Sequence, residues 1–181
     1  MAALFFLRAV DGMNAVLRHL VGAMLGVMVL IVGLQIVVRF VLPRLGIVLS
    51  VPWSEELARY LMVWCIFTGA AVAARSGALI AVDTLPDSLP RRAGDLVRLG
   101  ALLVTIGFFL GLVWLGARWV AFGQTETSTV LNIPMAWVYL SLPVGSALAI
   151  VNIAAFIVER RVTAKTSLAV APEDNPEASL I

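Results

Sequence analysis

Residues 20–38 read LVGAMLGVMVLIVGLQIVV, an apolar stretch in which Gln35 is the only strongly polar residue. About 20 such residues cross a hydrocarbon core about 30 Å thick when they form a helix. Three further stretches have comparable length and apolar character: residues 57–74, 99–117 and 135–158. None of them alternates like a barrel strand, and a chain in lipid must satisfy its own backbone hydrogen bonds. We therefore predict an all-α integral membrane protein with four spans.

Composition excludes most other classes of protein. The 181 residues are 61% hydrophobic and 13% charged, with a mean hydropathy of +1.01, whereas soluble domains average about 45–50% apolar and about 25% charged residues. The net charge is only +2, and no basic block with interleaved aromatic residues occurs, so nucleic-acid binding is not expected. The lone Cys65 cannot form an intrachain disulfide, and the lone His19 cannot build a metal site. No catalytic constellation is evident, so we expect no enzyme activity and no catalytic, cofactor-binding or metal-binding residues.

The basic residues predict the orientation of the four spans. With four spans, both termini and the loop between the second and third spans lie on one side of the membrane. That side carries nine basic residues: Arg8, Arg18, Arg75, Arg91, Arg92, Arg98, Arg160, Arg161 and Lys165. The other side carries three: Arg39, Arg44 and Arg118. Because cytoplasmic loops are enriched in Lys and Arg, both termini are predicted to be cytoplasmic.

Two segments flank the four-span domain of residues 20–158. In residues 1–19, apolar positions form a stripe broken by charged residues, a pattern typical of a helix in the membrane interface. A simple cytoplasmic extension of the first span explains the same residues, and both interpretations stay open. Residues 159–181 contain Pro, Glu, Asp, Asn and Ser with little periodicity, which predicts a disordered cytoplasmic tail.

Charged residues gather at the outer ends of the first two spans. Ser54 is expected to cap the second helix, and the carboxylates that follow it are favoured by the helix dipole. Glu55 precedes Arg59 by four residues, the better orientation for a helical ion pair, which leaves Glu56 and Arg39 to pair with each other or with a partner. Helix anchoring alone and anchoring combined with a partner interface both remain open. The candidate assembly residues are Arg39, Trp53, Glu55, Glu56 and Arg59.

Inside the spans, small residues are more prominent than polar ones. Three pairs have spacings that allow close helix packing: Gly22 with Gly26, Gly107 with Gly111, and Gly145 with Ala149. They serve either packing within this chain or docking of another membrane chain. The central polar residues are few, and secondary transporters usually place ionisable groups and broken helices at the membrane midplane. The sequence therefore does not favour a transporter that works alone.

Four stretches carry a family resemblance: QIVVRF (35–40), PWSEELARYLMVW (52–64), FTGAAVAARSGALIAVD (67–83) and NIPMAWVYLSLPVGSAL (132–148). Together they resemble the small, DctQ-type membrane subunit of tripartite ATP-independent periplasmic (TRAP) transporters. The resemblance covers roughly residues 20–158. Its most specific part is the pattern formed by Trp53, Glu55, Glu56 and Arg59, preceded by Arg39.

The resemblance implies a function in the bacterial inner membrane. Such a subunit pairs with a large multi-span membrane subunit, which carries the substrate and sodium, so this chain itself is expected to hold no cofactor. A periplasmic substrate-binding protein delivers an organic acid to the pair. The small subunit is expected to contact membrane lipids, to enlarge the scaffold and to help dock the binding protein. The alternative is a self-sufficient small exporter that forms homo-oligomers, which would need an ionisable residue in a shared midplane cavity.

Overall fold

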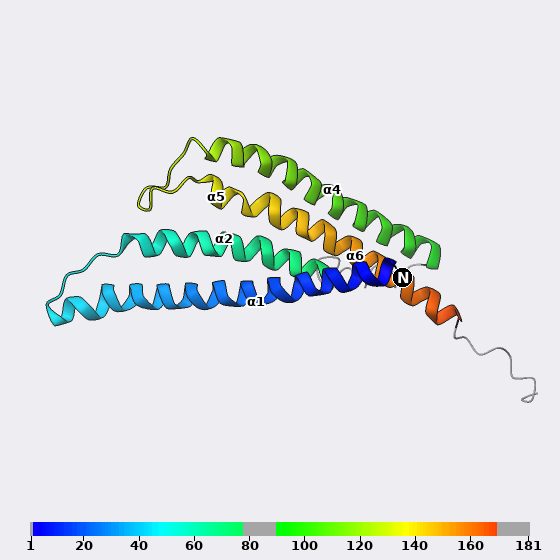
Figure 1. The fold of residues 1–181 in the computed structure, drawn as a ribbon, viewed down its shortest axis with the longest axis horizontal. Helices are drawn as coiled ribbons and strands as arrows, with labels where there is room; N and C mark the ends of the chain where they lie inside the picture. Colours follow the sequence, from blue (N-terminus) through cyan, green and yellow to red (C-terminus); the bar gives the residue numbers. More distant parts are fainter. Residues whose placement is uncertain (1, 78–89, 170–181) are drawn as a thin grey trace, which may run out of the picture.

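A computed structural model describes residues 2–77 and 90–169, and within these it has four long helices (Figure 1). They are α1 (Ala2–Ile36), α2 (Pro52–Arg75), α4 (Arg91–Gly123) and α6 (Ser141–Ala169), and the short α5 (Ala136–Tyr139) precedes α6. All four are long and apolar enough to cross a membrane. The predicted all-α, four-span architecture is confirmed.

The first helix is longer than its predicted span and has no break near residue 19. It starts at Ala2, contains no proline, and continues into a π-helical turn, η1 (Val37–Val41), and a 3-10 turn, η2 (Leu42–Leu45). Proline at position 43 removes a backbone donor, and Gly46 ends the turn in a left-handed conformation. Residues 2–19 therefore continue the first span as one helix, which favours the extension over a separate interfacial helix.

The second helix begins five residues before the predicted span. Pro52 occupies its first turn, where a missing backbone N–H has no consequence, and Val51 takes the cap position. Ser54 lies inside the first turn and donates a hydrogen bond to the Val51 carbonyl (2.6 Å). The prediction that Ser54 caps this helix is therefore wrong, because the proline starts the helix earlier.

The last helix continues beyond the span predicted to end at residue 158. It runs to Ala169, so residues 159–169, predicted to be disordered, are helical. This segment has neither proline nor glycine, and the next proline is Pro172, so no residue interrupts the helix. Residues 170–181 of the predicted tail lie outside the described residues.

The helices form one row in the order α1, α2, α6, α4 (Figure 1). Helices α1 and α4 form the two edges of the row and do not contact each other within the described residues. The core lies between α2, α6 and α4, and it consists of Ala71, Ala74, Phe109, Ala149 and Ile153. Alanines at these contacts let the helix backbones approach closely. The result is an open layer rather than a closed bundle.

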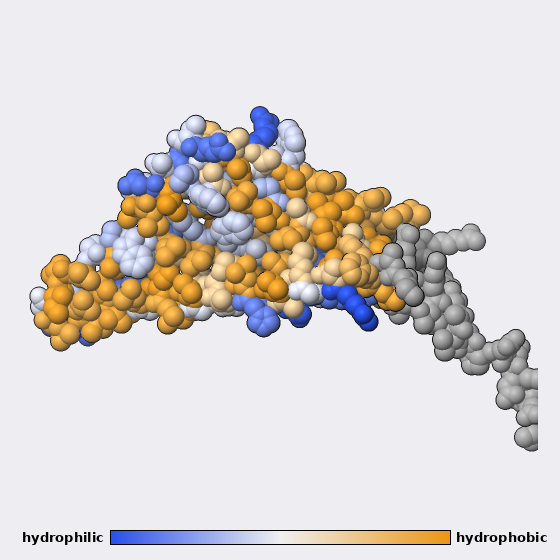
Figure 2. Space-filling model, viewed as in Figure 1, coloured by the Kyte–Doolittle hydropathy of each residue, from blue (hydrophilic) through white to orange (hydrophobic). Residues whose placement is uncertain are grey.

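The row has two ends. The hairpin end holds η1, η2 and residues 46–56 and 123–140, and the terminal end is where α1 begins and α6 leaves the row. The surface in this view is largely apolar, including the tip formed by η1, η2 and the following loop, and polar residues gather over the α4–α5 side of the hairpin end and in patches along α1 (Figure 2). Large exposed side chains on the edge helices include Leu30 on α1 (73% exposed) and Val104 on α4 (74% exposed). Such a surface suits lipid or a partner in the membrane.

Candidate functional site

The five candidate assembly residues all lie at the hairpin end. Arg39 is in the π-helical turn η1, and the other four occupy the first two turns of α2. Trp53 is 39% exposed, a position that suits an aromatic side chain at the edge of a membrane. The structure separates the four charged residues into three groups with different contacts.

Glu55 and Arg59 form the expected pair along α2. Arg59 Nη2 donates to Glu55 Oε1 at 3.1 Å, with side chains 63% and 70% exposed respectively. An exposed pair of this kind contributes only about 0–1 kcal/mol to the stability of the chain. The pair is thus of little use to the fold, and its charges are accessible to another molecule.

Glu56 is buried and does not pair with Arg39. One carboxylate oxygen accepts a hydrogen bond from the Tyr60 hydroxyl, and the other accepts from the backbone N–H groups of Val130 (3.2 Å) and Leu131 (2.9 Å). Both oxygens are therefore engaged inside the chain. The suggestion that Glu56 and Arg39 pair with each other is wrong, because α2 turns Glu56 toward the loop between α4 and α5.

That loop, residues 124–135, is a tight turn supported by Glu56. Its two arms are joined by hydrogen bonds from Ser128 N to Ile133 O (2.9 Å) and from Met135 N to Glu126 O (2.9 Å). Asn132 adopts a left-handed backbone conformation (φ 52°), which asparagine tolerates better than most residues. Glu56 thus holds the far side of the turn against α2 by bonding its free N–H groups.

Glu56→Ala is expected to loosen this loop, because three donors lose their carboxylate acceptor at once. Amide hydrogen exchange at Val130 and Leu131 should become at least about tenfold faster, while exchange in the middle of α2 stays unchanged. Glu55→Ala is the matched control, since it removes the neighbouring carboxylate without touching the loop. Equal exchange rates in the wild type and Glu56→Ala would show that the carboxylate does not hold the loop.

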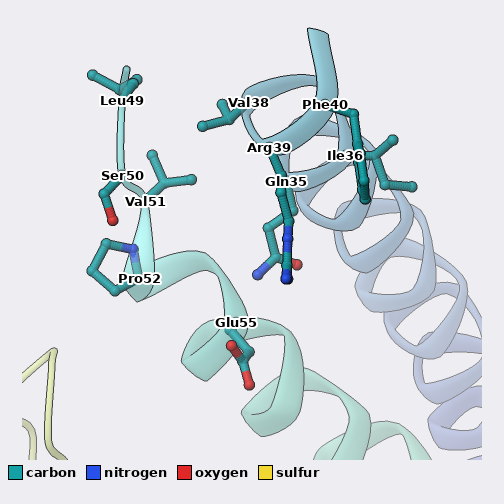
Figure 3. Close-up of a pocket in the computed structure, with 10 residues that line it drawn as sticks. All are labelled: Gln35, Ile36, Val38, Arg39, Phe40, Leu49, Ser50, Val51, Pro52 and Glu55. Atoms are coloured by element: carbon teal, nitrogen blue, oxygen red, sulfur yellow. The ribbon is translucent and has the colours of Figure 1, made fainter. Parts of the chain in front are cut away.

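Arg39 lines a crevice between the end of α1 and the start of α2. The crevice has a volume of about 620 Å³, and its polar lining consists of Gln35, Arg39, Ser50 and Glu55 (Figure 3). Within the described residues Arg39 makes no ion pair, and its guanidinium lies 6.0 Å from the ring centroid of Phe40. Figure 3 shows Gln35 and Arg39 extending toward the start of α2, where Glu55 lies. This crevice is an accessible polar site at the edge of an apolar surface.

A polar network at the terminal end was not predicted from the sequence. The buried amides of Asn14 on α1 and Asn152 on α6 donate to each other's oxygens at 2.6 and 2.9 Å. Asn152 also donates to the Ala71 carbonyl on α2 (2.6 Å), and Asn14 donates to the Val10 carbonyl (2.8 Å). Both asparagines were visible as rare amides in apolar helices, but 138 residues separate them and no spacing rule connects them.

Arg75 strengthens the same junction of three helices. Its guanidinium on α2 contacts Asp11 on α1 (2.8 Å) and Glu159 on α6. The ion pairs of Arg75 and the hydrogen bonds of the two asparagines are thus the main polar contacts that join α1, α2 and α6, and they lie at the terminal end. The hairpin end of α1 is left without such contacts in the described part of the chain, which is consistent with the open crevice there.

The small-residue pairs divide into two groups. A Cβ atom added at Gly145 would lie 2.6–2.8 Å from Phe67 on α2, and Ala149 is fully buried, so this pair packs inside the chain. Added Cβ atoms at Gly22, Gly26, Gly107 and Gly111 would meet nothing within 4 Å. These four glycines lie on open surfaces of α1 and α4, the two edges of the row.

Comparison with known proteins identifies a family. The family model for "Tripartite ATP-independent periplasmic transporters, DctQ component" matches residues 28–163. The chain is 35% identical over 105 residues to the C4-dicarboxylate TRAP transporter small permease protein DctQ of Rhodobacter capsulatus, covering 55% of this chain and 45% of that protein. It is 35% identical over 96 residues to the sialic acid TRAP transporter small permease protein SiaQ of Vibrio cholerae serotype O1, covering 51% and 54%. The match thus spans about half the length of these curated relatives.

A third relative is a much longer chain. The isethionate TRAP transporter permease protein DctMQ of Oleidesulfovibrio alaskensis is 28% identical over 103 residues. The match covers 56% of this chain but only 16% of that protein.

Proposed function

Because this chain belongs to the DctQ component family of the tripartite ATP-independent periplasmic transporters, we propose that it is an accessory subunit of an organic-acid importer. In this role it is not an enzyme. It joins a large multi-span membrane subunit in the bacterial inner membrane, enlarges the scaffold of that subunit, and helps to dock a periplasmic binding protein. Both termini lie in the cytoplasm, as the distribution of basic residues favours.

One observation carries this proposal: the four helices form an open row rather than a closed bundle. A row of four helices cannot enclose a solute pathway by itself, whereas its two apolar faces can both be covered by lipid or by another membrane chain. The membrane hydroxyls of Thr68 and Thr105 bond to carbonyls of their own helices, at Trp64 and Ala101. Their hydroxyl hydrogens are thus not available to donate to a solute.

The long relative supports a large membrane partner. The name of this relative, DctMQ, contains more than the small component DctQ, and the segment similar to this chain is a small part of its length, as in a fusion of a small with a larger membrane component. A fusion of this kind is expected when two membrane components work side by side. We therefore propose that the partner of this chain is the large membrane subunit of a TRAP transporter.

The substrates for which the relatives are named support an organic acid as cargo. C4-dicarboxylate, sialic acid and isethionate are all small acids. We propose that sodium and the acid are held by the large subunit, and that the exposed loop of residues 124–135 contributes to docking of the binding protein. The support for this last role is physical, since Glu56 holds the loop in one conformation and reduces the entropy lost on binding.

Removal of Arg59 tests the partnership at the hairpin end. Arg59→Ala is expected to reduce co-purification of the large membrane subunit about tenfold, because Glu55 would be left as an unpaired charge in a desolvated interface. Glu55→Ala combined with Arg59→Ala should partly restore co-purification. The measurement is the ratio of the two subunits recovered in mild detergent from membranes with matched expression.

Arg118→Ala is the matched control for the loss of an arginine. Arg118 lies on α4 at the same end of the row and contacts the ring of Trp114. If Arg59→Ala recovers as much large subunit as the wild type does, the Glu55–Arg59 pair is only a helix anchor.

A further inference from the structure

The crevice at the hairpin end has the dimensions and lining of a small-ligand site. Its volume of about 620 Å³ lies within the range of about 300–1,000 Å³ that is typical of ligand pockets. Its apolar walls include Ile36, Val38, Leu49, Val51 and Pro52. The site therefore combines an apolar surface with a few polar groups, as ligand sites usually do.

The two charged side chains of the crevice, Arg39 and Glu55, lie on opposite walls and have opposite charges (Figure 3). Arg39 on η1 and Gln35 on α1 supply a guanidinium and an amide, both of which donate hydrogen bonds. Glu55 on α2 supplies a carboxylate whose Oε1 is bonded to Arg59, so its other oxygen can accept from a ligand. Arg39 and Glu55 form no ion pair with each other among the described residues, so each can bind one end of a ligand.

The position of the crevice indicates what kind of ligand reaches it. It lies where α2 begins, close to the half-exposed Trp53, at the end of two helices that are apolar enough to cross a membrane. Tryptophan is enriched at the level of the lipid headgroups. Exposed apolar side chains such as Phe40 (59%) and Leu49 (54%) border the crevice and can contact acyl chains.

The π-helical turn sets the direction of Arg39. A π turn adds a residue to the helix and rotates the following side chains, and such turns occur often at functional sites. In η1 this turn spans Val37–Val41 and has Arg39 at its centre. Pro43, which begins the next turn, prevents the regular helix from continuing past this point.

We propose that this crevice binds the headgroup of phosphatidylethanolamine. The phosphodiester accepts hydrogen bonds from Arg39 and Gln35, and the primary ammonium donates to the free oxygen of Glu55. Phosphatidylcholine fits less well, because its quaternary ammonium has no N–H to donate. Phosphatidylglycerol has no cation to place against Glu55.

Lipid retention by the purified full-length chain tests this site. The chain is incubated in mild detergent with equal amounts of the three phospholipids, and the bound lipids are counted by native mass spectrometry. We expect phosphatidylethanolamine to be retained about tenfold more than phosphatidylcholine or phosphatidylglycerol, as one charge-assisted hydrogen bond would give. Arg39→Ala and Glu55→Gln should each remove this preference, whereas Arg118→Ala should keep it.

The variants are compared only if their circular dichroism matches the wild type, and Arg39→Lys, which keeps the charge, should retain part of the preference. Equal retention of the three lipids by the wild type would overturn the proposal. So would an unchanged preference in Arg39→Ala, or a preference for phosphatidylglycerol, which would indicate a simple anion site. No partner or transport is involved in this readout, so its failure leaves the proposed transport role untouched.

Discussion

Asn152→Leu is expected to destabilise the chain by about 2–3 kcal/mol, because the amide of Asn14 stays buried without its partner. Asn152 is fully buried and bonds to both α1 and α2, so its loss affects three helices at once. Leucine has a similar shape, so the effect reports the hydrogen bonds rather than a cavity. Measured interhelical hydrogen bonds in membranes average only about 0.6 kcal/mol, and the larger value here reflects the unsatisfied group.

Chemical unfolding in detergent micelles measures this effect. Asn14→Leu combined with Asn152→Leu should recover much of the loss, since no amide is then left unpaired. Thr105→Val is the control, because that hydroxyl bonds only within its own helix on an exposed face. If Asn152→Leu unfolds at the same denaturant concentration as Thr105→Val, the amide pair does not hold the helices together.

Two glycine substitutions separate the inner contacts of the row from its open faces. Gly145→Leu should destabilise the chain by about 3 kcal/mol or more, because its Cβ would overlap the backbone of Phe67. Gly111→Leu should leave the stability of the isolated chain within about 0.5 kcal/mol, since nothing lies within 4 Å of an added Cβ there. The thermal unfolding midpoint of each purified variant is the measurement.

Gly111→Leu also tests whether lipid or the large subunit covers the open face of α4. If the large subunit covers Gly111, Gly111→Leu should reduce co-purification of that subunit while leaving the fold intact. A loss of stability in Gly111→Leu, or none in Gly145→Leu, would contradict the arrangement of helices in the row.

The sequence predicts the spans well because each is a local property of about 20 residues. Residues 20–38 are apolar enough to identify a span without knowledge of their neighbours. The ends of the helices are predicted less well, since they depend on single residues such as Pro52, which starts α2 before Ser54 can cap it. The helical extension past residue 158 was missed because composition alone describes a polar segment as disordered.

Polar contacts could be predicted only where both partners lie on one helix, and those between helices could not. The Glu55–Arg59 pair follows from a spacing of four residues and is confirmed. Glu56, in contrast, bonds to Val130 and Leu131 across more than 70 residues, and Asn14 bonds to Asn152 across 138. Such contacts depend on how the helices are arranged in the row, which a pattern along the chain does not contain.

Solute uptake by reconstituted liposomes tests the central claim most directly. Liposomes carrying this chain alone, the chain with the large TRAP membrane subunit, or the large subunit alone are supplied with a sodium gradient and the binding protein. The probes are labelled sialic acid, isethionate and succinate, the last as a C4-dicarboxylate, which matches the acids named for the relatives. An accessory subunit in an open row should give no sodium-dependent uptake alone and should support uptake only together with the large subunit. Sodium-dependent uptake of any of these acids by this chain alone would contradict the account.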